Sequence, residues 1–94
     1  SMRLAIDVTS RHIAIGLSDN CEECPVALSI AEMGFFELNV NHSTIQFSES
    51  YGSPSFWVAT TPDEVRNFMY AFDANKPVEP FSFELKLEWH QVNL

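Results

Sequence analysis

Alternating apolar and polar residues predict the strands of this chain. Leu4, Ile6 and Val8 stand at every second position near the start, which is the period of a half-buried strand. Further strands are predicted over 36–40, 45–47, 56–60 and 81–90. In the last of these, every second residue from Phe81 to Trp89 is large and apolar, so we expect this strand inside the sheet or at an interface. The polar residues 41–43 separate two of the runs and predict a β-hairpin.

Apolar residues spaced three and four apart predict two main helices. One runs from Pro25 to Met33, with Cys24 near its N-cap and Gly34 as its left-handed end. The other follows Thr61 and ends at Asn75, and its apolar face is formed by Val65, Phe68, Met69 and Phe72.

Hydroxyl side chains predict how two helices begin. Thr61 precedes a proline and Glu64 follows three residues after it, which is the spacing of a capping box. Near the N-terminus, Thr9 or Ser10 can cap a short helix that ends at Gly16. A short helix is therefore expected beside the two main ones.

These elements predict one α+β domain covering 2–94, with Ser1 as the remnant of a cleaved tag. We expect about five strands in an antiparallel or mixed sheet, packed against the two main helices and the short one. A sheet this rich in large apolar residues exceeds what three short helices can cover, so we also expect homo-oligomers.

Composition narrows the classes of partner. The apolar fraction of 46% and the twelve Phe, Trp and Tyr residues indicate a folded chain rather than a disordered acidic tail. A net charge of −8 repels phosphate backbones, so direct binding to nucleic acid is not expected, whereas a basic protein surface remains a suitable partner. No run is long and apolar enough to predict a membrane span, and two cysteines are too few for a disulfide scaffold, which favours an intracellular setting.

The segment Cys21-Glu22-Glu23-Cys24-Pro25 carries the C-x-x-C spacing of redox and zinc proteins. Two intervening glutamates disfavour a thiolate, and His12, His42 and His90 are isolated in the sequence, so a full ligand set for zinc is not predicted. Small packing cysteines are the favoured interpretation. Cys21 and Cys24 remain weak candidates for a thiol or metal site.

No spacing of residues predicts catalysis. There is no nucleophile elbow and no glycine-rich phosphate loop, so we predict neither an enzyme nor a cofactor. Aromatic side chains around the serine-rich segment 48–55 can stack on a ligand, and a few cations near the predicted helices can meet an anion. The candidate ligand-binding residues are Arg11, His12, Tyr51, Trp57 and Arg66.

Two segments resemble a group of short bacteriophage and prophage proteins. They are CEECPVALSI at 21–30 and FDANKPVEPFSFEL at 72–85, and the likeness covers most of the chain except a divergent middle. The resemblance implies a small accessory phage protein in the cytoplasm of a bacterial host. It carries over no functional residue.

In that setting we expect stoichiometric binding rather than catalysis. The first hypothesis is a counter-defence protein that sequesters a small, nucleotide-derived host signal between subunits. The alternative is an acidic inhibitor of a basic host protein, as a nucleic-acid mimic, for which the charge is favourable. The third is a thiol redox or metal protein built on Cys21 and Cys24.

Overall fold

The computed structural model describes residues 1–92 of the 94-residue chain. Its framework is a five-stranded antiparallel sheet in the order β1-β5-β4-β3-β2. The strands are β1 (Met2–Val8), β2 (Phe36–Val40), β3 (Thr44–Ser48), β4 (Phe56–Thr60) and β5 (Phe81–His90). The predicted α+β class is confirmed, and every strand pair is antiparallel.

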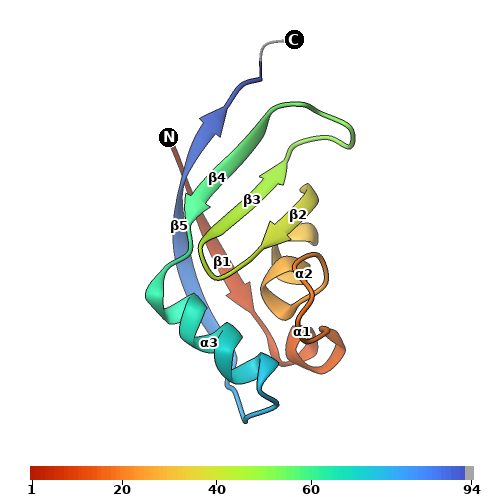
Figure 1. Ribbon diagram of the computed structural model, residues 1–94, viewed down its shortest axis with the longest axis vertical. Helices are drawn as coiled ribbons and strands as arrows, with labels where there is room; N and C mark the ends of the chain where they lie inside the picture. Colours follow the sequence, from red (N-terminus) through yellow and green to blue (C-terminus); the bar gives the residue numbers. More distant parts are fainter. Residues whose placement is uncertain (93–94) are drawn as a thin grey trace.

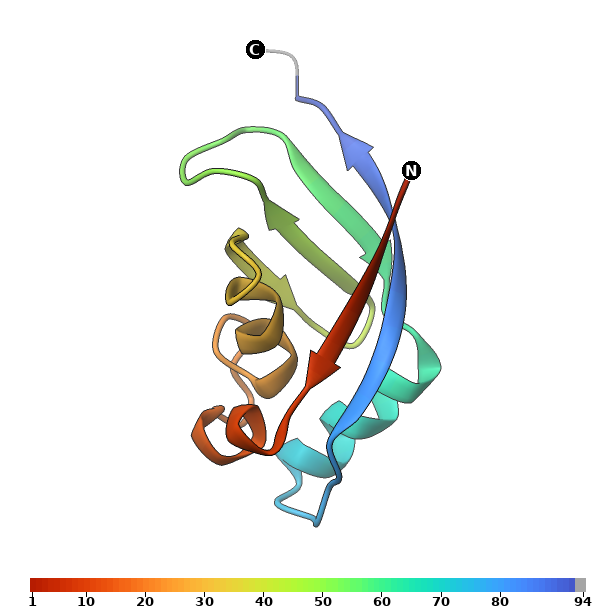
Figure 2. The ribbon, with the colours of Figure 1, turned by 180° about the vertical axis from the view of Figure 1, so that it is seen from behind.

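The last strand lies inside the sheet, as its alternation predicts. β5 pairs with β1 from Met2↔Leu87 to Val8↔Phe81, so the first and last strands of the sequence run side by side (Figure 2). On its other side β5 pairs with β4. Phe83, Leu85 and Leu87 are buried, and the residues between them are exposed, because one face of the strand meets the core and the other meets solvent.

The sheet curls into a half-barrel, and helix α2 (Pro25–Ala31) closes its open side (Figure 1). This helix contacts both edge strands, β1 and β2. Its residues Val26, Ala27 and Ile30 are fully buried against the sheet. Within residues 1–92, no helix combines the length and the apolar character that crossing a membrane requires.

Helix α3 (Asp63–Asp73) covers one end of the core, but its start differs from the prediction. The N-cap is Pro62, no side chain caps the helix, and the predicted capping box of Thr61 and Glu64 is wrong. The Thr61 hydroxyl instead donates to the carbonyl oxygen of Asn41 at 2.8 Å. Thr61 is buried beside the β2–β3 hairpin, so its hydroxyl satisfies a carbonyl there rather than the helix end.

Most of the predicted ends of helices α1 (Ser10–Ile15) and α2 are confirmed. Thr9 caps α1, and Cys24 is the N-cap of α2 with Pro25 in the first turn. α2 ends at Ala31, two residues before the predicted Met33, because the last turn tightens into bonds between residues three apart. Gly34 then has the predicted left-handed backbone, with φ of +99°.

Candidate functional site

An open groove of about 730 Å³ lies along β2 at the edge of the sheet. Its walls come from the turn before α2, the end of α2, β2 with the residue before it, Gln46 of β3, and the loop between β3 and β4. The lining residues that matter most for binding are Glu22, Glu23, Phe35, Phe36, Glu37 and Tyr51.

A break in the β2–β3 ladder shapes this groove. The register of the pairing shifts between Phe36 and Asn39. Inside the shifted segment Glu37 has φ of +54°, a left-handed conformation that residues other than glycine rarely adopt. The Glu37 carboxylate accepts a hydrogen bond from the backbone N–H of Gly52, whose φ of +78° suits glycine. Glu37 thereby holds the loop between β3 and β4 beside the groove.

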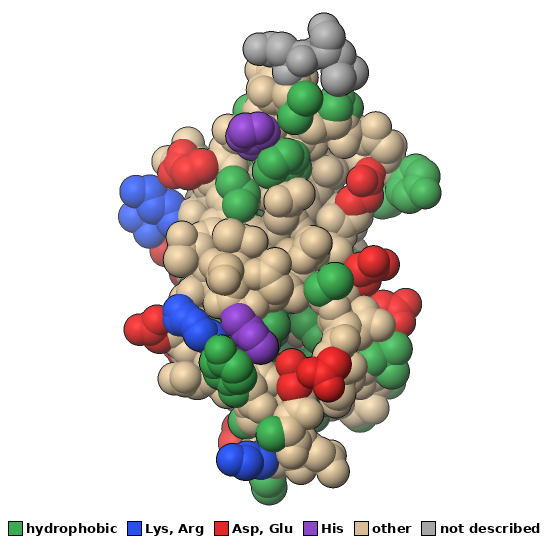
Figure 3. Space-filling model, in the orientation of Figure 1, with side chains coloured by type: hydrophobic (Ala, Val, Ile, Leu, Met, Phe, Trp, Pro, Cys, Tyr) green, Lys and Arg blue, Asp and Glu red, His purple; other side chains and the backbone are tan. Residues whose placement is uncertain are grey.

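Three carboxylates give the groove its charge. Glu22 and Glu23 lie in the turn before α2, where both backbone N–H groups donate to the side-chain oxygen of Asn20, at 3.0 and 2.9 Å. Glu37 lines the same groove from β2. Among the described residues, no cation forms an ion pair with any of these three carboxylates. Figure 3 shows acidic side chains along the edge over β2 and this turn, whereas the basic side chains at the opposite edge lie among further acidic ones.

Aromatic side chains supply the apolar part of the groove. Phe35 packs on the core residue Phe47, with ring centroids 4.4 Å apart, and is fixed in place. Phe36 is 44% exposed and Tyr51 is 86% exposed. Large exposed apolar side chains next to unpaired carboxylates are suited to a ligand that is both apolar and positively charged.

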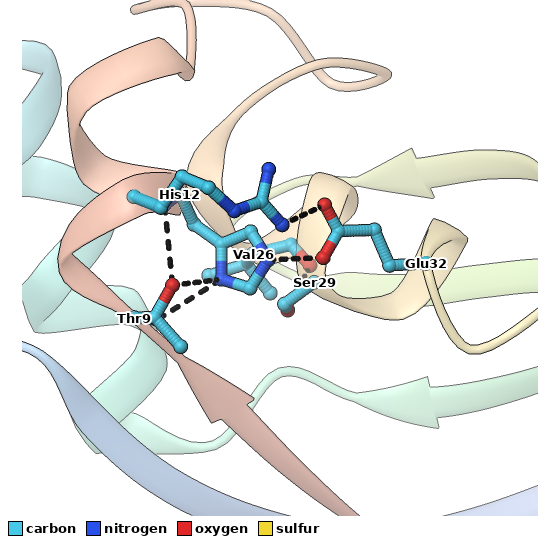
Figure 4. A network of polar contacts seen from close by, with 6 residues as sticks. Thr9, His12, Val26, Ser29 and Glu32 are labelled. Atoms are coloured by element: carbon cyan, nitrogen blue, oxygen red, sulfur yellow. Dashed lines mark hydrogen bonds and ion pairs between the residues drawn. The ribbon is translucent and has the colours of Figure 1, made fainter.

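Two of the predicted ligand-binding residues, Arg11 and His12, lie outside the groove and join α1 to α2. Both contact the carboxylate of Glu32, at the end of α2 (Figure 4). His12 Nδ1 accepts the N–H of Thr9 at 3.0 Å, so the ring proton lies on Nε2 and is donated to Glu32 Oε1 at 2.8 Å. Arg11, followed by His12, lowers the pKa of Glu32. This network stabilises the helix pair.

The other three predicted residues lie on separate elements. Tyr51 is in the loop between β3 and β4, and it is the one residue of the five that lines the groove. Trp57 in β4 donates its indole N–H to Glu49 at 3.1 Å. Arg66 in α3 pairs with Asp63 at 2.8 Å. The structure therefore does not bring the five predicted residues together.

Sequence reasoning missed most of the groove. In the sequence, Glu22 and Glu23 are neighbours of the cysteines, and nothing marks them as a binding surface. The alternation around Phe36 predicts only a strand, and nothing in the sequence indicates that Glu37 adopts a left-handed backbone. The available signal was local: two adjacent acids in a turn, and an acid between Phe36 and Leu38 in a short strand.

A smaller pocket of about 260 Å³ lies at the other side of the turn before α2. Cys21, Cys24, His42 and Asp73 line it, so the fold brings a histidine and a carboxylate to the C-x-x-C segment. Both cysteines are free; burial raises the pKa of the Cys24 thiol, whereas Cys21 is exposed. His42 Nε2 lies 3.9 Å from the Asp73 carboxylate. Over residues 1–92, no three Cys, His, Asp or Glu side chains group closely enough to hold a metal ion.

Comparisons with known proteins identify no relative. No protein-family model matches the chain, and neither the curated proteins nor the solved structures contain a significant match. The function therefore has to be inferred from the geometry and the charge of the two sites.

Proposed function

We propose that this protein acts by stoichiometric binding, and that the groove along β2 takes a basic segment of a partner protein. The observation that carries the proposal is a set of three carboxylates, Glu22, Glu23 and Glu37, around exposed aromatic rings; none of the three forms an ion pair with a cation of residues 1–92. Lysine or arginine side chains of the partner would meet the carboxylates, and their aliphatic stems or a neighbouring apolar residue would cover Phe36 and Tyr51.

The size and the charge of the groove support a peptide segment. Its volume of about 730 Å³ is comparable to that of small-molecule pockets, about 300–1,000 Å³, and its open shape leaves room for a chain that continues beyond it. The net charge of −8 adds a long-range attraction for a basic partner, which raises the rate of encounter at low salt. Binding would therefore weaken as salt is added, since exposed charges are screened over about 10 Å at 0.1 M ionic strength.

The bulge in β2 favours recognition through side chains rather than strand addition. β2 is an edge strand, and an extended peptide can add to such an edge by backbone hydrogen bonds. The shifted register between Phe36 and Asn39 breaks the regular row of donors and acceptors that this mode needs. Specificity would then depend on the acids and the aromatic rings.

The hypothesis of a sequestered nucleotide-derived signal has less support from the geometry. A phosphate ligand needs cations or free backbone amides, and the candidates were Arg11 and Arg66. Both pair with carboxylates of their own chain, Glu32 and Asp63, and neither lines the acidic groove. In the phage setting that the sequence resemblance implies, the inhibitor of a basic host protein is therefore the preferred proposal.

A direct test uses a fluorescently labelled peptide of Arg, Lys and Leu residues. Its Kd is measured by anisotropy for the wild type and for a Glu22→Gln, Glu23→Gln double variant. The matched control is Glu79→Gln, Glu88→Gln, which removes the same charge at exposed positions outside the groove.

We expect the groove variant to bind about 2–30-fold more weakly, because it removes two exposed ion pairs that contribute about 0.2–1 kcal/mol each. The control should bind within about twofold of the wild type. Equal losses in both variants would show that the net charge, and not the groove, attracts the peptide.

A further inference from the structure

The two cysteines of the smaller pocket lie in one helical turn and differ in exposure. The backbone N–H of Cys24 donates to the carbonyl of Asn20 at 3.1 Å, which closes a single turn over 20–24. Residues three apart in such a turn have Cβ atoms about 5–6 Å apart. A disulfide needs about 3.5–4.5 Å. Cys21 and Cys24 can therefore be joined by a small tightening of this turn.

The same turn is attached to the groove. The carbonyl of Cys21 accepts a hydrogen bond from the backbone N–H of Val40 in β2, at 2.8 Å. Glu22 and Glu23, which lie between the two cysteines, line the groove on its other side. Tightening the turn would shift both carboxylates and strain the bond to β2.

We propose that Cys21 and Cys24 form a reversible disulfide by exchange with a low-molecular-weight disulfide, and that this disulfide weakens binding in the groove. The effect on binding rests on the proposed function, whereas the formation of the disulfide does not. A low-molecular-weight disulfide can reach Cys21 because this residue is exposed, and both cysteines line the same pocket of about 260 Å³.

The exchange proceeds in two steps. The exposed Cys21 thiolate attacks one sulfur of the oxidant, R–S–S–R; a mixed disulfide forms, the S–S bond of the oxidant breaks, and R–S⁻ leaves and takes up a proton. Cys24 then loses its proton to solvent, and its thiolate attacks the Cys21 sulfur, which releases the second R–S⁻ to be protonated. The two cysteines are oxidised, and one R–S–S–R is reduced to two R–SH.

The first experiment is independent of the groove. The reduced wild-type protein is incubated with oxidised glutathione, and its intact mass is measured. We expect the loss of two hydrogens, reversed by dithiothreitol. The variant Cys24→Ser should keep one glutathione on Cys21, whereas Cys21→Ser should stay unmodified because Cys24 is buried. Serine at Cys24 still caps α2, and circular dichroism checks the fold of both variants. A wild type that stays fully reduced, or that accumulates only adducts, would overturn the proposal.

The second experiment separates regulation from the proposed function. Kd for the Arg, Lys and Leu peptide is measured for the reduced and the oxidised wild type, and amide hydrogen exchange is followed at Val40. We expect oxidation to weaken binding about fivefold or more and to speed exchange at Val40. Unchanged binding and unchanged exchange would refute the regulation. If the reduced protein does not bind the peptide, the proposed function fails, and the exchange at Val40 still decides whether the disulfide alters the groove.

Discussion

The contact between Gly16 and Pro25 gives a prediction whose magnitude follows from the structure. A Cβ atom on Gly16 would lie 2.7 Å from Cδ and Cγ of the Pro25 ring and 2.8 Å from the carbonyl oxygen of His12. These distances are too short for real contacts, and neither a proline ring nor a backbone carbonyl can rotate away. The backbone of Gly16 has φ of −68°, so the penalty in Gly16→Ala is steric and not conformational.

We expect Gly16→Ala to lower the free energy of unfolding by about 1–3 kcal/mol, the usual range for overpacking. In a domain of this size, each kcal/mol corresponds to a fall in Tm of about 4–8 °C. Urea titration and thermal melting by circular dichroism measure both quantities. Gly34→Ala is the control, because a Cβ there has no neighbour within 4 Å and meets only the left-handed backbone, with φ of +99°. That strain should cost about 1–2 kcal/mol.

A Gly16→Ala protein as stable as the wild type would refute this description of the junction between α1 and α2. The junction matters for the groove because Leu17, the next residue, donates its N–H to the carbonyl of Glu23 at 2.9 Å. A protein that shifts α1 to relieve the clash should therefore also bind the basic peptide more weakly.

Two further predictions concern the hydrogen bonds that position the elements. Thr61→Val should lower the free energy of unfolding by about 0.5–1.5 kcal/mol, because the buried Thr61 loses its hydrogen bond to the carbonyl of the exposed Asn41, and a urea midpoint equal to that of the wild type would contradict this role. The lowered pKa of Glu32 means that its contacts with Arg11 and His12 stabilise the fold above the ordinary pKa of glutamate, and that this contribution is lost as the pH falls through the lowered value. Glu32→Gln should therefore be less stable than the wild type at neutral pH, and the difference in urea midpoint should shrink in acid; a constant difference would show that the charge is not responsible.

The sequence predicts the framework of this fold well because the strands alternate strongly. The alternation from Phe81 to His90 predicts both ends of β5 correctly, and the turn residues 41–43 predict the β2–β3 hairpin. Thr61 misleads because a local capping pattern cannot reveal that a carbonyl of the hairpin needs the same hydroxyl. A tertiary contact of this kind decides whether a threonine hydroxyl caps a helix or binds a distant carbonyl, and the local sequence is the same in both cases.

The candidate site was much less predictable than the fold. The groove depends on the left-handed backbone of Glu37 and on the position of the turn before α2 beside β2. The spacing of the apolar residues indicates neither property. Arg11 pairs with Glu32, which is distant in the sequence, and Arg66 pairs with Asp63, three residues before it. Only the fold shows which acid each arginine meets. The homo-oligomer expected from the apolar sheet stays a prediction, and light scattering can test it by measuring the mass of the protein in solution.

The most direct test of the central claim maps where the basic peptide binds. Amide ¹H–¹⁵N spectra of the reduced protein are recorded while the Arg, Lys and Leu peptide is added. If the groove is the binding site, the largest shifts fall on Glu22, Glu23, Phe36, Glu37 and Tyr51, and residues of α3 stay unchanged. Shifts spread evenly over the acidic surface, or centred on α3, would contradict the account.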